Sequence, residues 1–207
     1  MKHDGLSKAF IVISLLFVLM IEPASELSAQ ASMNRNNTVD TLMQKEEKET
    51  VSAVVFPTVK GSNLSGNKFT LPEDFEGELN LVMVAFLREQ QALVDTWIMP
   101  ADSLEKNFDG FVYYEFPTIS RLNPVSRWFI NQGMRAGIPN PKARARTITL
   151  YIDKESFKRE LEIPTEQTIY IFLVDRMGRL LWRSDGEYTS AKAMELEQHI
   201  VQAIGPE

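Results

Sequence analysis

The sequence predicts an α/β fold with three layers, in which helices cover both faces of a mixed central sheet. Two almost unbroken apolar runs, residues 79–86 and 168–174, are typical of strands that are buried on both faces. Between these runs the apolar spacing changes to three and four residues, which indicates helices. With 207 residues, of which 44% are hydrophobic, the chain can bury one sizeable core but not two. We therefore expect a single folded domain over residues 53–207.

The first 31 residues are typical of a signal peptide for export. Lys2 and Lys8 lie before an apolar stretch over residues 9–21, and Ala29-Gln30-Ala31 provides a small-x-small cleavage site. The stretch is shorter than the roughly 20 residues that cross a bilayer, which favours cleavage over retention as a membrane anchor. Residues 32–52 are polar and rich in mixed charges, as expected of a flexible linker. We expect a periplasmic or extracellular protein, with a retained N-terminal membrane anchor as the alternative.

The domain should begin with a small hairpin. Residues 54–61 and 68–72 are extended in character, and Gly66-Asn67 between them is typical of a hairpin turn. The buried strand at residues 79–86 follows, and we expect it to lie at the centre of the sheet.

A kinked helix and a second strand should come next. From Gln90 an apolar stripe indicates a helix that Pro100 interrupts, with Asp102 as a new N-cap for its second half. A strand over residues 111–116, closed by Pro117, then completes a βαβ unit. Its crossover should be right-handed.

Residues 118–146 fit no simple connection, and we expect an irregular insertion. Asn123-Pro124 is a start signal for a helical stripe over residues 125–134, but the prolines of residues 138–141 exclude regular structure there. The remaining predicted elements are a strand over residues 147–152, a helix over 156–161 capped by Asp153, the buried strand over 168–174, a tight turn at 175–178 leading into a strand over 179–184, and a helix from Ser190 that buries Ala193, Leu196, Ile200 and Ile204.

This order of elements resembles the thioredoxin-like superfamily in its peroxiredoxin form. The stretches GSNLSGNKFTLPEDFEGELNLVMVAF (residues 61–86) and TIYIFLVDRMGRLLWRSDGE (residues 168–187) are similar to the two halves of that signature. The stretch PTISRLNPVSRWFINQGMRAGIPNPKARARTITLYID (residues 117–153) resembles the family of the mitochondrial assembly factor that helps build the membrane sector of ATP synthase. That family is thioredoxin-like but is not known for thiol chemistry. An exported chain need not share the mitochondrial partner.

The chain contains no cysteine, so it departs from redox-active thioredoxin-like proteins at the reactive site itself. Counting back from Pro100 places the lost cysteine pair near Ala92 and Asp95, whereas counting forward from Phe86 places it near Gln91 and Val94. Neither register contains a nucleophile. Peroxide reduction requires a thiolate, and the hydroxyl of Thr96 cannot replace one without a base. Thiol oxidoreductase activity is therefore excluded on chemical grounds.

Other polar features are better explained without a site. The acidic residues between Glu73 and Glu78 lack the spacing of a calcium loop and fit a solvated loop. Glu89 and Asp95 fit a hydrated helix start better than an acid–base pair, and His199 should be a surface side chain. We expect no metal and no cofactor. The net charge of −6 argues against a nucleic-acid partner.

One segment differs in charge from the rest of the chain. No acidic residue lies between Glu115 and Asp153, whereas residues 118–146, which we call the basic aromatic insertion, carry positive and aromatic side chains. Arginine and aromatic residues are enriched at the centres of protein interfaces. The candidate partner-binding residues are Arg121, Arg127, Trp128, Phe129, Arg135, Lys142, Arg144 and Arg146. The alternative is that the insertion covers the sheet and its arginines are solvated or paired with the acidic remainder.

Two functions remain. The first, which the sequence favours, is a non-catalytic binding or assembly module of the cell envelope. Its basic aromatic insertion would engage a protein partner or a membrane-proximal acidic surface. The second is a redoxin-like enzyme with cysteine-free chemistry, for which the sequence offers no nucleophile.

Overall fold

The computed structural model describes residues 54–205. The predicted signal peptide (residues 1–31) and linker (residues 32–52) lie outside these residues. Within residues 54–205, no helix combines the length and the hydrophobicity that a membrane span requires.

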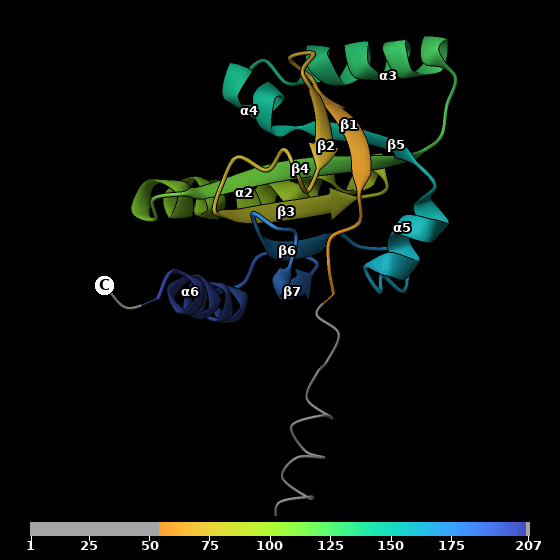
Figure 1. Cartoon of the computed structure of the whole chain (residues 1–207). Helices are drawn as coiled ribbons and strands as arrows, with labels where there is room; N and C mark the ends of the chain where they lie inside the picture. Colours follow the sequence, from red (N-terminus) through yellow and green to blue (C-terminus); the bar gives the residue numbers. More distant parts are fainter. Residues whose placement is uncertain (1–53, 206–207) are drawn as a thin grey trace, which may run out of the picture. The chain divides into compact units, whose positions relative to one another are not determined.

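Seven strands form one mixed sheet in the order β2-β1-β5-β4-β3-β6-β7 (Figure 1). They are β1 (Val59–Asn63), β2 (Lys68–Leu71), β3 (Leu79–Ala85), β4 (Phe111–Ser120), β5 (Ile148–Ile152), β6 (Tyr170–Asp175) and β7 (Leu180–Asp185). β4 runs parallel to both β3 and β5, and the other neighbours are antiparallel. The predicted N-terminal and C-terminal hairpins, β1–β2 and β6–β7, are both present. The expectation that residues 79–86 form the central strand is wrong, because the β1–β2 hairpin joins β5 and so leaves β4 in the middle.

β4 is longer than predicted, because Pro117 does not end it. The strand pairs with β3 as far as Pro117, opposite Ala85, and with β5 from Thr118, opposite Leu150. Proline lacks the backbone N–H that a ladder needs. Here its position coincides with the change of partner strand, so the ladder tolerates it.

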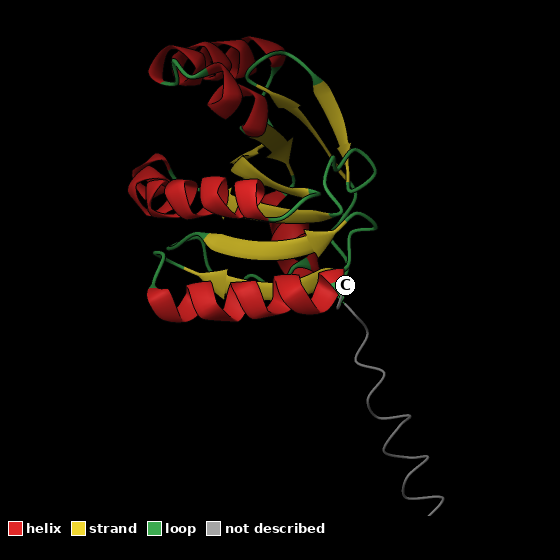
Figure 2. Ribbon diagram, turned by 90° about the vertical axis from the view of Figure 1, so that its left-hand side faces the viewer, coloured by secondary structure: helices red, strands yellow, loops and turns green. Residues whose placement is uncertain are grey.

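Helices cover the two faces of the sheet (Figures 1 and 2). α2 (Gln91–Asn107) and α6 (Ser190–Ile204) lie on one face, where Trp97 and Leu196 share a core with β3, β4 and β6. α5 (Lys154–Glu160) lies on the other face, where Phe157 joins an aromatic core with Phe56 and Phe116. The three layers that the sequence predicts are therefore present.

Three details of the helices differ from the expectations. Pro100 lies inside α2 without ending it, and Asp102 does not cap a new helix, because its carboxylate instead accepts a hydrogen bond from the Tyr113 hydroxyl (3.0 Å). Leu196 and Ile200 of α6 are buried as predicted. Ile204 in the last turn is half exposed, since α6 extends past the core there.

The basic aromatic insertion is not irregular. Its first residues, 118–120, belong to β4, and the remainder forms α3 (Pro124–Gly137) and α4 (Pro141–Arg146). Each helix begins with a proline, whose missing N–H is harmless at the first helical position. Each helix is also capped by an asparagine. The side-chain oxygen of Asn123 accepts a hydrogen bond from the Ser126 N–H, and that of Asn140 accepts one from the Lys142 N–H. Pro124 starts a helix as predicted, and residues 138–140 are irregular as predicted, but Pro141 starts α4 instead of excluding a helix. We call residues 121–146 the α3–α4 segment.

Candidate functional site

A buried glutamine fills the turn in which a thioredoxin-like domain carries its reactive cysteines. The turn consists of a short 3₁₀ helix, η1 (Arg88–Gln90), between β3 and α2. The Gln90 Oε1 atom accepts hydrogen bonds from the N–H groups of Phe86 (2.8 Å) and Leu87 (3.2 Å), and its Nε2 donates to the carbonyl oxygen of Glu166 (2.7 Å). The turn is therefore held to the loop before β6 by one side-chain amide.

Glu115 of β4 lies beside the first turn of α2, and the sequence analysis did not single it out. The Nε2 group of Gln91 donates to both Glu115 Oε2 (3.3 Å) and Asp95 Oδ1 (3.0 Å), so one amide bridges two carboxylates. Burial raises the pKa of Glu115, the hydrogen bond from Gln91 opposes this shift, and the nearby Asp95 charge adds to it. The sequence signal for this buried carboxylate is a single glutamate within an otherwise apolar and aromatic stretch of β4.

We expect Glu115→Gln to raise the thermal midpoint at pH 8 by about 2–4 °C, the effect of about 1 kcal/mol in a domain of this size, and by less at pH 4. The pKa of Glu115 is raised in the folded state. The stability that Glu115 contributes to the free energy of unfolding is therefore fully present below its unfolded-state pKa. It is lost as the pH rises through its folded-state pKa. The amide retains an acceptor for Gln91 but never becomes charged. Thermal melts between pH 4 and pH 8 measure the difference, with Glu89→Gln in the preceding turn as the control. Equal shifts at both pH values would contradict this account.

Three arginines of the predicted partner-binding set are bound to backbone carbonyl oxygens. The Nε–H groups donate from Arg127 to Leu122 (2.7 Å), from Arg135 to Leu64 (2.8 Å) and from Arg144 to Ile138 (2.6 Å). Because Leu64 follows β1, Arg135 ties α3 to the N-terminal hairpin. The Arg127 guanidinium also lies over the ring of Tyr151 in β5 (5.1 Å). Arg135 and Arg127 thus hold α3 to the hairpin and to β5, whereas the Arg144 side chain bonds within the α3–α4 segment, to the carbonyl oxygens of Ile138 and Arg135.

Two of the three basic residues of α4, Lys142 and Arg146, are paired with carboxylates. The four contacts are Lys142 Nζ with Asp102 and with Glu105 (both 2.6 Å), Arg146 Nη2 with Glu105 (2.6 Å) and Arg146 Nη1 with Glu76 (3.0 Å). The hydrogen bonds to Asp102 and Glu105 raise the pKa of Lys142. For these residues the alternative in the sequence analysis is correct, because their charges are paired with the acidic remainder of the domain.

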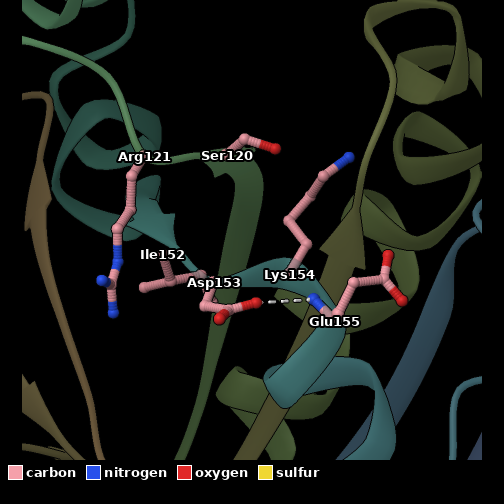
Figure 3. Close-up of a pocket in the computed structure, with 6 residues that line it drawn as sticks. All are labelled: Ser120, Arg121, Ile152, Asp153, Lys154 and Glu155. Carbon is pink, nitrogen blue, oxygen red and sulfur yellow. Dashed lines mark hydrogen bonds between the residues drawn. The ribbon is translucent and has the colours of Figure 1, made fainter.

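Arg121 differs from the other five basic residues. Its side chain makes no hydrogen bond or ion pair with any other residue in the described range 54–205 and lines an open pocket of about 350 Å³ at the ends of β4 and β5. Figure 3 shows the side chains of Arg121 and Lys154 pointing away from each other. Lys154 is paired with Glu166 instead. The pocket therefore lacks a set of polar groups that converge on a ligand.

The aromatic residues of the predicted set lie on the surface. Val125, Trp128 and Phe129 of α3 are 65%, 57% and 65% exposed, and α3 has no fully buried residue. The rings of Trp128 and Phe129 pack edge to face with 4.9 Å between their centroids. Together with Pro124, the three residues line an open hollow of about 530 Å³. An amphipathic surface helix normally turns its apolar side to the core, so α3 is unusual in exposing these side chains.

Comparison with known proteins assigns the chain to a family and supports the fold. The model of the family described as ATP10 protein matches residues 44–202. No curated protein matches the chain in sequence.

Three solved structures are similar to the domain. A putative electron transport protein from Aquifex aeolicus VF5 is 8% identical, with 74% of this chain and 99% of that chain covered and a TM-score of 0.53. BsSco, a member of the Sco family of cytochrome c oxidase assembly proteins, is 13% identical, with 74% and 96% covered and a TM-score of 0.51. A putative thiol:disulfide interchange protein DsbE from Chlorobium tepidum is 18% identical, with 74% and 97% covered and a TM-score of 0.47. Similarity at these identities concerns the fold alone, and the predicted thioredoxin-like architecture is confirmed.

Proposed function

Because the chain belongs to the ATP10 protein family, we propose that it acts as a non-catalytic assembly module that holds a protein partner in the cell envelope. This is the family of the assembly factor for the membrane sector of ATP synthase, to which residues 117–153 bear their resemblance. Assembly factors act by binding other proteins, so a protein partner follows from the same premise.

The turn between β3 and α2 carries this proposal. The chain has no cysteine, and the buried amide of Gln90, directly before both candidate positions of the lost cysteine pair, makes all its hydrogen bonds to the backbone of the domain itself. Reduction of peroxides or disulfides by this fold requires a thiolate. The fold is therefore used for binding, and the alternative of a cysteine-free redoxin-like enzyme has no observed nucleophile in its support.

The α3–α4 segment is the proposed contact region. Four of its basic residues fix the segment to the rest of the domain, namely Arg127, Arg135, Lys142 and Arg146, and Arg144 bonds within the segment. Trp128 and Phe129, in contrast, are exposed. Large exposed aromatic side chains supply much contact area for little conformational entropy, which suits the centre of an interface.

Complex assembly in the source cells tests the proposal. In cells that lack the chain, native gels of the envelope fraction should show the loss of one multi-subunit complex, although its subunits are still synthesised. Restoring the full chain should restore that complex. Normal amounts of every envelope complex in the deletion strain would overturn the assembly function.

The purified chain should be inert toward peroxide and disulfides. We expect no peroxidase activity and no insulin reduction above a buffer blank, because the protein has no thiol to oxidise. A cysteine-containing thioredoxin assayed in parallel provides the positive control. Turnover that co-elutes with the pure chain would instead favour the enzyme alternative.

Export should remove the first 31 residues, so the mature chain should begin at Ser32. The motivation is the cleavage site Ala29-Gln30-Ala31, which follows an apolar stretch too short to span a bilayer. Intact mass spectrometry of the protein from the envelope fraction measures this. A mass that includes residues 1–31 would replace secretion by membrane anchoring and leave the assembly function unchanged.

A further inference from the structure

Four exposed apolar residues of α3 and one glutamine form one row along the helix. Val125, Trp128, Phe129, Gln132 and Ala136 recur at intervals of three and four residues, and all five are exposed. We call this row the α3 stripe. The opposite side of α3 faces the sheet, where Asn131 accepts a hydrogen bond from the Tyr151 hydroxyl of β5 (2.8 Å). In both Figure 1 and Figure 2, α3 lies at the margin of the domain with no described element on its outer side.

The α3 stripe is bulky at its start and shallow at its end. Val125, Trp128 and Phe129 occupy the N-terminal half, whereas Gly133, Ala136 and Gly137 lie in the C-terminal half. A Cβ atom added at Gly133 or Gly137 would meet no atom within 4 Å, so the domain itself does not require glycine there. Glycine inside a helix is about 0.5–1 kcal/mol less favourable than alanine. Small residues allow the backbone of a second helix to approach closely, so the small residues of the C-terminal half fit the binding of another helix.

The charges around the stripe favour a protein over a lipid surface. Attraction to an anionic membrane grows by about 1 kcal/mol for each basic residue near the surface, so it needs several free cations. Five of the six basic residues in the segment are bound within the domain, and Arg121 is the one without a partner among the described residues. The stripe itself is neutral.

The same charges disfavour a second copy of the chain as the occupant. No acidic residue lies between Glu115 and Asp153, so α3 of a second copy would itself bring no carboxylate to Arg121. A partner with an acidic residue beside its apolar surface would supply one. Acidic groups are also favoured at the N-terminal end of a helix, which is the end of α3 nearest to Arg121 in sequence.

We infer that the α3 stripe binds an amphipathic helix of the partner protein, which crosses α3 near Gly133 and Ala136. A large apolar side chain of that helix occupies the hollow beside Trp128 and Phe129, and an acidic side chain pairs with Arg121. The inference rests on the proposed function only in assuming that a protein partner exists.

Photo-crosslinking in the source cells tests it. The photoreactive residue p-benzoylphenylalanine is placed in the full chain at position 128, 129 or 132, and at the control position of Met99 on α2, which is 79% exposed. Mass spectrometry then identifies the crosslinked peptides. We expect positions 128, 129 and 132 to react with one partner segment at residues spaced three or four apart, and Met99 not to react with that segment.

Several outcomes would overturn the inference that the partner binds as a helix. They are crosslinks to lipid, to a second copy of this chain, or to partner residues spaced two apart as in a strand, and the absence of crosslinks from the stripe. If a partner is captured only from Met99, the assembly function stands and this inference fails. If no position captures a partner and all envelope complexes assemble without the chain, the proposed function fails as well.

Two variants sharpen the test. Gly133→Leu should leave the thermal midpoint unchanged or higher, because the added side chain points into open space, but should lower the crosslink yield from position 128 at least tenfold. Gln132→Ala, in the same row without added bulk, should change the yield less than twofold. An unchanged yield in Gly133→Leu would overturn the close helix crossing.

A lipid control uses the protein's own fluorescence. Trp128 is exposed, whereas the other two tryptophans, Trp97 and Trp182, are buried. Vesicles of phosphatidylglycerol and phosphatidylcholine should therefore leave the emission of the purified chain unchanged. A blue shift that is lost in Trp128→Ala would show a membrane as the occupant and overturn the inference.

Discussion

Replacing Arg146 by Glu will lower the unfolding free energy by about 2–3 kcal/mol, which lies between the loss of a buried ion pair and that of an exposed one. The guanidinium pairs with Glu105 (2.6 Å) and Glu76 (3.0 Å), and its side chain is mostly buried. It also lies over the ring of Tyr114 at 5.5 Å. A glutamate there would face the carboxylates of Glu76 and Glu105, of which, among the described residues, only Glu105 keeps a cation, Lys142, so like-charge repulsion would add to the lost pairs.

Urea unfolding measures this loss, and two variants act as controls. Arg146→Lys keeps the charge but not the two-pronged geometry, so it should cost about 1 kcal/mol. Arg121→Glu changes the charge at a position without a partner among the described residues and should stay within about 0.5 kcal/mol. Equal losses in Arg146→Glu and Arg121→Glu would mean that the ion pairs of α4 contribute nothing specific.

The sequence alone leads to a different expectation for these arginines. It shows a cluster of positive charge in an acidic protein, from which binding is a reasonable prediction. It does not show that Arg146 meets carboxylates 70 and 41 residues away along the chain, or that Arg135 reaches a carbonyl 71 residues away. Such partners are set by the topology of the sheet, and no local pattern records them.

The fold was easier to predict than the site, because burial leaves a local pattern. The apolar runs that form β3 and β6 identified two interior strands, and the asparagine and proline before Val125 identified the start of α3. The start of α4 is ambiguous in the sequence, because its Pro141 can signal either the end of regular structure or the first position of a helix, where proline is favoured. Spacing predicted the stripe on α3, but a period of 3.6 residues does not determine which side of a helix faces solvent. That depends on how the segment is fastened to the sheet.

The turn before α2 gives the second large prediction: Gln90→Leu should lower the unfolding free energy by about 2–3 kcal/mol. Leucine is similar in size but leaves the N–H groups of Phe86 and Leu87 and the carbonyl of Glu166 without their present partner. Each buried polar group left unpaired costs about 1–3 kcal/mol. Water that enters the turn would pair with some of the three groups and so reduce the total loss.

Neighbouring and related substitutions separate the hydrogen bonds from other effects. Gln91→Leu, one residue later and exposed, should cost less than about 1 kcal/mol. Gln90→Glu keeps an acceptor for the two N–H groups but loses the donor to Glu166, so its stability should lie between those of the wild type and Gln90→Leu at pH 4. Urea unfolding and amide exchange at Phe86 and Leu87 provide the readouts. Wild-type protection of these two amides in Gln90→Leu would show that the side chain does not hold the turn. The turn would then not be closed by Gln90, and its hydrogen bonds would no longer support the proposed binding function.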